Sequence, residues 1–118
     1  MRLKIVYLLI ALFITSIATA QTESAYYFSK TIDKSFEETV LAVEKELKEE
    51  GFGTITEVDM DKKLKEKIDK VELDSYKILG VCNSGYAYET IQHEANIGLF
   101  LPCKVLVKKV NDNKILFS

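Results

Sequence analysis

The sequence is poor in the residues from which most catalytic and metal sites are built. Its 118 residues include one histidine, two cysteines and one proline. Two cysteines are too few for a disulfide scaffold. The sequence also has no HExxH pair, nucleophile elbow or phosphate-cradling glycine-rich loop. The chain therefore carries none of the motifs that identify zinc proteases, serine hydrolases or P-loop proteins.

A strong charge of one sign is missing as well. The chain has 16 basic and 18 acidic residues. They are interspersed, as in EKELKEE (44–50) and DKKLKEK (61–67), which is typical of a solvated surface. Because no basic patch or stripe results, nucleic acid is not expected as a partner.

The N-terminus has the pattern of a secretory signal peptide. Arg2 and Lys4 precede an apolar run over residues 5–17, and Ala-Thr-Ala at 18–20 supplies a small-residue cleavage site. The run is shorter than the roughly 18–20 residues that a membrane-spanning helix needs. We therefore expect a signal peptide over 1–20 and one mature domain over 21–118. The protein would be exported, periplasmic or secreted, with no stable membrane anchor after cleavage.

The clearest local pattern predicts a helix that starts at Phe36. Ser35 and Glu38 have the spacing of a capping box, and apolar residues recur at helical spacing from Phe36 to Leu47. Gly51 can adopt the positive φ at which helices commonly stop. One face of this helix should be buried against a sheet.

The remaining patterns predict strands and two shorter helices. A charged helix over 62–69 would be capped by Asp59 or Asp61, and a helix from Tyr86 would bury Tyr88 and Ile91. The apolar run ILGVC suggests a strand that is buried on both faces. Strands are expected at 25–32, 52–58, 75–82, 99–110 and 114–117. Because strands and helices do not alternate regularly, an antiparallel α+β fold is expected.

Four segments, in order and spacing, resemble the family called domain of unknown function 302. They are GFGTITEVDM (51–60), LKEKID (64–69), YKILGVCN (76–83) and IGLFLPCKVLV (97–107). The resemblance implies a curved antiparallel sheet with helices packed on one side, similar to half of a TATA-binding protein. It also implies a homodimer, and no agreed biochemical function.

The chain departs from the family pattern in two places. Ser84 follows Asn83 where the family often has proline, and the family usually continues through a further strand and a C-terminal helix that this sequence lacks. A truncated product or a partner that supplies the cover would explain the second difference. Without that helix, part of one sheet face would be exposed and would favour association.

The two cysteines are the main candidates for chemistry. Cys82 and Cys103 can be small buried residues, a structural disulfide, or a functional thiol pair for redox or soft-metal chemistry. Cys82 precedes a predicted helix N-terminus, which would lower a thiol pKa. With His93, the two thiols are weak candidates for a metal site, and a Cys–His nucleophilic pair is conceivable. The sequence does not identify a cofactor.

Other polar and aromatic groups have structural explanations beside functional ones. Glu57, Asp59 and Asp61 could bind a hard cation or act as acid and base, but strand termination and helix capping are favoured. Tyrosines could line a ligand groove, although packing on a sheet face is favoured; they are Tyr26, Tyr27, Tyr86 and Tyr88.

The sequence predicts an exported, non-enzymatic module that binds a small ligand, a metal or a protein partner. The expected place is a groove between sheet and helix near Cys82, Asn83 and Cys103. The alternative is a thiol-based redox or sulfur-handling protein that uses the two cysteines.

Overall fold

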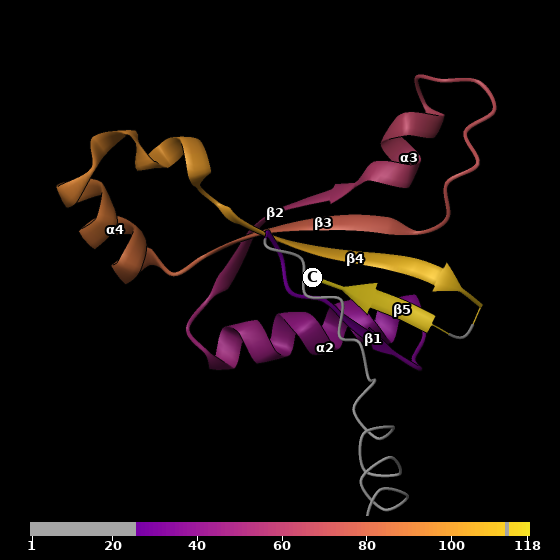
Figure 1. The fold of residues 1–118 in the computed structure, drawn as a ribbon, viewed down its shortest axis with the longest axis horizontal. Coiled ribbons are helices and arrows are strands. Elements are labelled where there is room, and N and C mark those ends of the chain that lie inside the picture. Colours follow the sequence, from indigo (N-terminus) through magenta and orange to yellow (C-terminus); the bar gives the residue numbers. More distant parts are fainter. Residues whose placement is uncertain (1–25, 113) are drawn as a thin grey trace, which may run out of the picture.

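An open five-stranded antiparallel sheet carries one long helix, α2, on one of its faces (Figure 1). The computed structural model describes residues 26–112 and 114–118. The strands lie in the order β1-β5-β4-β3-β2, and each neighbouring pair is antiparallel. The predicted α+β class, with helices on one side of an antiparallel sheet, is confirmed. The elements are β1 (Lys30–Ile32), α2 (Phe36–Glu49), β2 (Gly53–Asp59), α3 (Met60–Lys65), β3 (Tyr76–Cys82), α4 (Ser84–His93), the 3-10 helix η1 (Ala95–Phe100), β4 (Cys103–Asn111) and β5 (Lys114–Phe117).

Both ends of α2 are fixed by the residues that the sequence singled out. The Ser35 hydroxyl accepts a hydrogen bond from the Glu38 N–H, while the Glu38 carboxylate accepts one from the Ser35 N–H at 3.1 Å. At the other end Gly51 has a φ of 84°. The N–H groups of Gly51 and Phe52 donate to the carbonyls of Lys48 and Leu47, at 3.1 and 2.8 Å. This pair is a Schellman motif, so the predicted start and stop of the helix are both confirmed.

The core lies between α2 and the middle of the sheet. Val40 of α2 packs with Val107 of β4 and Ile115 of β5. In β3, residues 79–81 are all buried, as the apolar run predicted. Because side chains alternate along a strand, Val105 and Val107 face α2, while Lys104 and Leu106 face the opposite side. Partly buried side chains complete the cluster, namely Ile32, Phe36 and Phe117.

Several predicted boundaries are wrong. The first strand is only Lys30–Ile32 within the described part of the chain, and the charged helix begins at Met60 rather than 62 and ends at Lys65. Residues 99–100 belong to η1 instead of a strand. The strand β4 then begins at Cys103, directly after Pro102, which has no N–H to donate to a ladder. The pairing of β2 with β3 shifts register between Thr54 and Thr56, as it does at a β-bulge.

No helix in the described ranges 26–112 and 114–118 is both long and apolar enough to cross a bilayer. The predicted signal peptide lies outside these ranges, and export stays a prediction.

Candidate functional site

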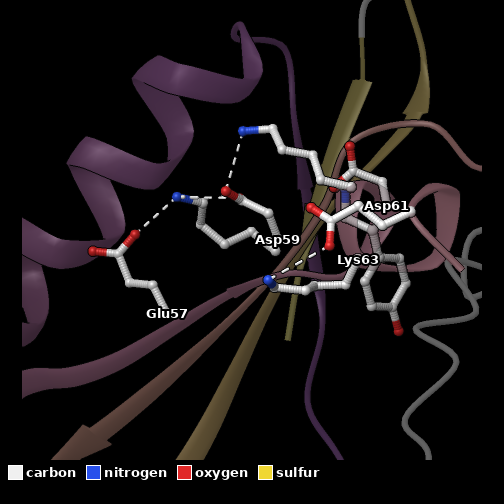
Figure 2. A network of polar contacts seen from close by, with 8 residues as sticks. Glu57, Asp59, Asp61 and Lys63 are labelled. Carbon is white, nitrogen blue, oxygen red and sulfur yellow. Dashed lines mark hydrogen bonds and ion pairs between the residues drawn. The ribbon is translucent and has the colours of Figure 1, made fainter.

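Glu57 and Asp59 direct their carboxylates toward one half-buried lysine of the neighbouring strand (Figure 2). They lie two residues apart on β2, and β3 places Lys77 directly opposite Asp59. The Lys77 Nζ donates to Glu57 Oε2 at 2.8 Å and lies 3.4 Å from Asp59 Oδ1. Lys62 donates to the second oxygen of Asp59 at 3.1 Å. The Lys77 side chain is only 17% exposed, so its charge needs these partners.

The network favours the charged forms of Lys77 and Asp59. The hydrogen bond to Glu57 raises the pKa of Lys77, and the negative charge of Asp59 adds to the effect. The hydrogen bond from Lys62 holds the pKa of Asp59 below its usual range, and the positive charge of Lys77 acts in the same direction. A lysine nucleophile needs a lowered pKa, so this arrangement favours a structural ion-pair network over an acid–base or amine site.

The predicted end of the strand at these carboxylates is confirmed, since β2 ends at Asp59, but the predicted capping by their side chains is wrong. Asp59 precedes α3, but its side chain makes no capping hydrogen bond, because Lys62 and Lys77 occupy its oxygens. The Asp61 carboxylate accepts from the Tyr76 N–H at 3.4 Å. It therefore ties α3 to β3 instead of capping the helix.

The two cysteines are free and lie on neighbouring strands. Cys103 pairs directly with Val81, the residue before Cys82. Because successive side chains of a strand point to opposite faces, the register directs the two thiols to opposite faces of the sheet. A disulfide between them is not formed and would require backbone movement. Cys103 is exposed, and Cys82 is half-buried.

Asn83 and His93 mark the two ends of α4. The Asn83 side chain accepts a hydrogen bond from the Tyr86 N–H at 3.1 Å and so caps the helix. His93 lies exposed in the last turn. Among the described residues, no group of three His, Cys, Asp or Glu side chains could hold a metal ion. The weak candidate set of Cys82, His93 and Cys103 is thus not brought together.

An apolar groove opens beneath the C-terminal half of α2. It has a volume of about 600 Å³ and is lined almost entirely by apolar surface. Val43 and Leu47 form its helix side, and Val105 and Phe117 form its sheet side. Charged residues also take part in the lining, namely Lys30, Lys34, Glu46 and Glu50. The groove has the chemistry of a surface that receives an apolar group.

The segment over residues 84–101, named the arm from here on, projects away from the sheet and from α2 (Figure 1). It comprises α4 and η1, which contact each other extensively and no other described element to a comparable extent. Neither helix has a buried residue. The predicted burial of Tyr88 and Ile91 is wrong, because α4 leaves the sheet instead of packing on it.

The tyrosines divide into two pairs. Tyr26 and Tyr27 line a smaller, more polar groove on the face opposite α2, together with Lys104 and Lys108. Tyr86 and Tyr88 stand exposed on the arm. The favoured packing of all four on a sheet face is therefore wrong for the second pair.

Comparison with known proteins identifies the family. The family model described as "Domain of unknown function DUF302" matches residues 28–118. The chain belongs to the DUF302 family. A solved structure, an uncharacterized conserved DUF302 protein from Bacillus stearothermophilus, is similar with a TM-score of 0.72 and 29% sequence identity. The match covers 80% of this chain and 73% of the other. No curated protein matches the chain.

Membership in DUF302 supports the fold and assigns no activity. The groove under α2 and the isolation of the arm were not foreseen from the sequence. One sequence signal does point to the arm: residues 78–103 contain neither lysine nor arginine, in a chain that has 16 of them. Loss of lysine together with exposed aromatic residues is typical of protein interfaces.

Proposed function

We propose that this DUF302 protein is an exported, non-enzymatic module that receives an apolar segment of a protein partner in the groove under α2. The observation that carries the proposal is the groove itself, which is open, has a volume of about 600 Å³ and has a nearly all-apolar surface. Its charged residues are flexible lysines and glutamates. A site for a small polar ligand would instead need a few precisely placed polar groups.

The groove under α2 is not at the position that the sequence predicted. The expected groove lay between sheet and helix near Cys82, Asn83 and Cys103. The groove under α2 also lies between sheet and helix, at the end of β4 that begins with Cys103. None of the three candidate residues is part of its lining. We therefore assign the binding role to Val43, Leu47, Val105 and Phe117.

A thiol-based function remains the alternative hypothesis. It would use Cys103, which is exposed, or Cys82, which is half-buried. The strand register does not support a redox-active disulfide between Cys82 and Cys103 of one chain, because their thiols point to opposite faces of the sheet. Apolar binding is thus the better-supported proposal.

The test combines footprinting with an apolar dye on protein purified after expression of the full chain. If a partner already fills the groove, Val43 and Leu47 should resist carbene labelling. If the groove is open, it should bind the apolar dye 8-anilinonaphthalene-1-sulfonate. In the open case, Leu47→Glu should weaken dye binding at least fivefold. Leu41→Glu, on the same helix but outside the groove, should leave dye binding unchanged. A groove that is neither protected nor able to bind the dye would overturn the proposal.

A further inference from the structure

Three lysines in residues 26–112 and 114–118 are half-buried, and one of them lacks a carboxylate partner. Lys77 and Lys109 each form ion pairs with two carboxylates, over 2.8 to 3.6 Å. Lys108 lies next to Lys109 on β4 and therefore points to the opposite face of the sheet. No carboxylate of the described residues forms an ion pair with Lys108. Its ammonium group therefore depends on water or on an anion from outside the chain.

Lys108 lines an open groove of about 460 Å³ on the face of the sheet opposite α2. Lys104 lines the same groove from a position roughly 13 Å away along β4. Leu106 lies between the two lysines, and Leu116 of β5 pairs directly with Lys108. The groove thus has an apolar floor with a lysine on either side. Two exposed aromatic residues complete this part of the lining, namely Tyr26 and Tyr27.

Acidic side chains do not compensate these lysines. Neither aspartate nor glutamate is among the described residues that line this groove, whereas two glutamates line the groove under α2. Ser118 is part of the lining, and its main-chain oxygen accepts a hydrogen bond from the Leu106 N–H at 2.7 Å. Asp74 borders a neighbouring hollow that Lys108 also lines, but its carboxylate pairs with Lys109 at 3.6 Å. The groove therefore offers positive charge beside apolar and aromatic surface.

We propose that this groove binds a small amphipathic anion, a molecule with an apolar or aromatic body and one anionic group. The anionic group pairs with the ammonium group of Lys108, because the Lys104 ammonium group already donates to the Pro102 carbonyl oxygen at 2.8 Å. The body lies on Leu106 and Leu116. A volume of about 460 Å³ is typical of small-molecule sites, which combine a mainly apolar lining with a few polar groups. The site is on the other face of the sheet from the groove under α2 and does not depend on it.

Two probes that differ only in charge test the proposal on protein purified after expression of the full chain. They are 3-phenylpropionate and its neutral amide, 3-phenylpropionamide, which share the aromatic body. Chemical-shift mapping of the backbone amides by NMR should place the carboxylate probe at Leu106, Lys108 and Leu116. Its dissociation constant should be about fivefold lower than that of the amide, as expected for one partly buried charge pair.

Variants then assign the preference to one side chain. Lys108→Gln should bind both probes equally, whereas Lys108→Arg keeps the charge and should keep the preference. Lys48→Gln removes an exposed charge on α2 outside the groove, and Leu47→Glu alters only the groove under α2. Both should leave the preference unchanged. Equal binding of the two probes by the wild type, binding of neither, or shifts confined to the groove under α2 would overturn the proposal. Each of these results would leave the proposed function of that other groove to its own test.

Discussion

Gly80 lies on β3 between its two neighbouring strands and close to Pro102, and its replacement tests the sheet register. It pairs with Thr56 of β2 and Lys104 of β4. A Cβ added at Gly80 would overlap the Thr56 hydroxyl oxygen and come within 3.0 Å of the Pro102 ring. Overpacking of this kind typically costs about 1–3 kcal/mol. We therefore expect Gly80→Ala to lower the free energy of unfolding by about that amount.

A double-mutant cycle isolates the cause. Thr56→Ala removes the overlapping hydroxyl oxygen, while the Thr56 Cβ, 3.5 Å from the added Cβ, would remain at ordinary contact distance. The double variant should therefore recover about 1 kcal/mol relative to additive behaviour. The residual loss would come from Pro102.

Gly53→Ala is the matched control for this cycle. Its added Cβ would meet nothing closer than the Cys82 carbonyl oxygen at 4.0 Å. Its effect should stay within about 0.5 kcal/mol. Urea unfolding followed by circular dichroism measures all four variants. Equal effects of Gly80→Ala and Gly53→Ala, or strict additivity with Thr56→Ala, would refute the register.

Three further predictions concern the caps, the ion pairs and one strained loop residue. Ser35→Ala removes the capping box and should lower the free energy of urea unfolding by about 1 kcal/mol; an unchanged midpoint would contradict the cap. The pKa of Asp59 is lower in the folded than in the unfolded protein. The charged Asp59 therefore stabilises the fold at pH values above its unfolded-state pKa of about 3.9, and this stabilisation is lost as the pH falls through the folded-state pKa. Asp59→Asn should therefore flatten the fall in stability below about pH 4, and a parallel pH profile would rule this out. Lys70 has a φ of 61°, so Lys70→Gly should raise thermal stability by up to about 1 kcal/mol, whereas a loss would argue against the left-handed geometry.

Local sequence signals predicted α2 well because its stabilising contacts are local. The capping box joins residues three apart, and the Schellman motif joins residues three and five apart. The strand β3 could be predicted equally well, because a continuous apolar run is typical of a strand that is buried on both faces. These elements needed no knowledge of what lies beside them.

The Lys77 network and the arm could not be predicted in this way. Strand periodicity places Glu57 and Asp59 on the same face of β2. Which lysine lies opposite them depends on the register between β2 and β3, and this register shifts at the bulge in β2. The spacing of Tyr88 and Ile91 indicated an amphipathic helix without indicating what covers it. Helical spacing shows which face of a helix is apolar. Whether the sheet covers that face depends on where the flanking strands place the helix.

The state of the groove under α2 tests the account most directly. Carbene labelling of Val43 and Leu47, which line the groove, is compared with labelling of Leu41, which lies on the same helix outside it. The account predicts that Val43 and Leu47 are protected relative to Leu41, or, if they are labelled, that the groove binds 8-anilinonaphthalene-1-sulfonate and that Leu47→Glu weakens this binding. Full labelling of Val43 and Leu47 together with no dye binding would contradict it.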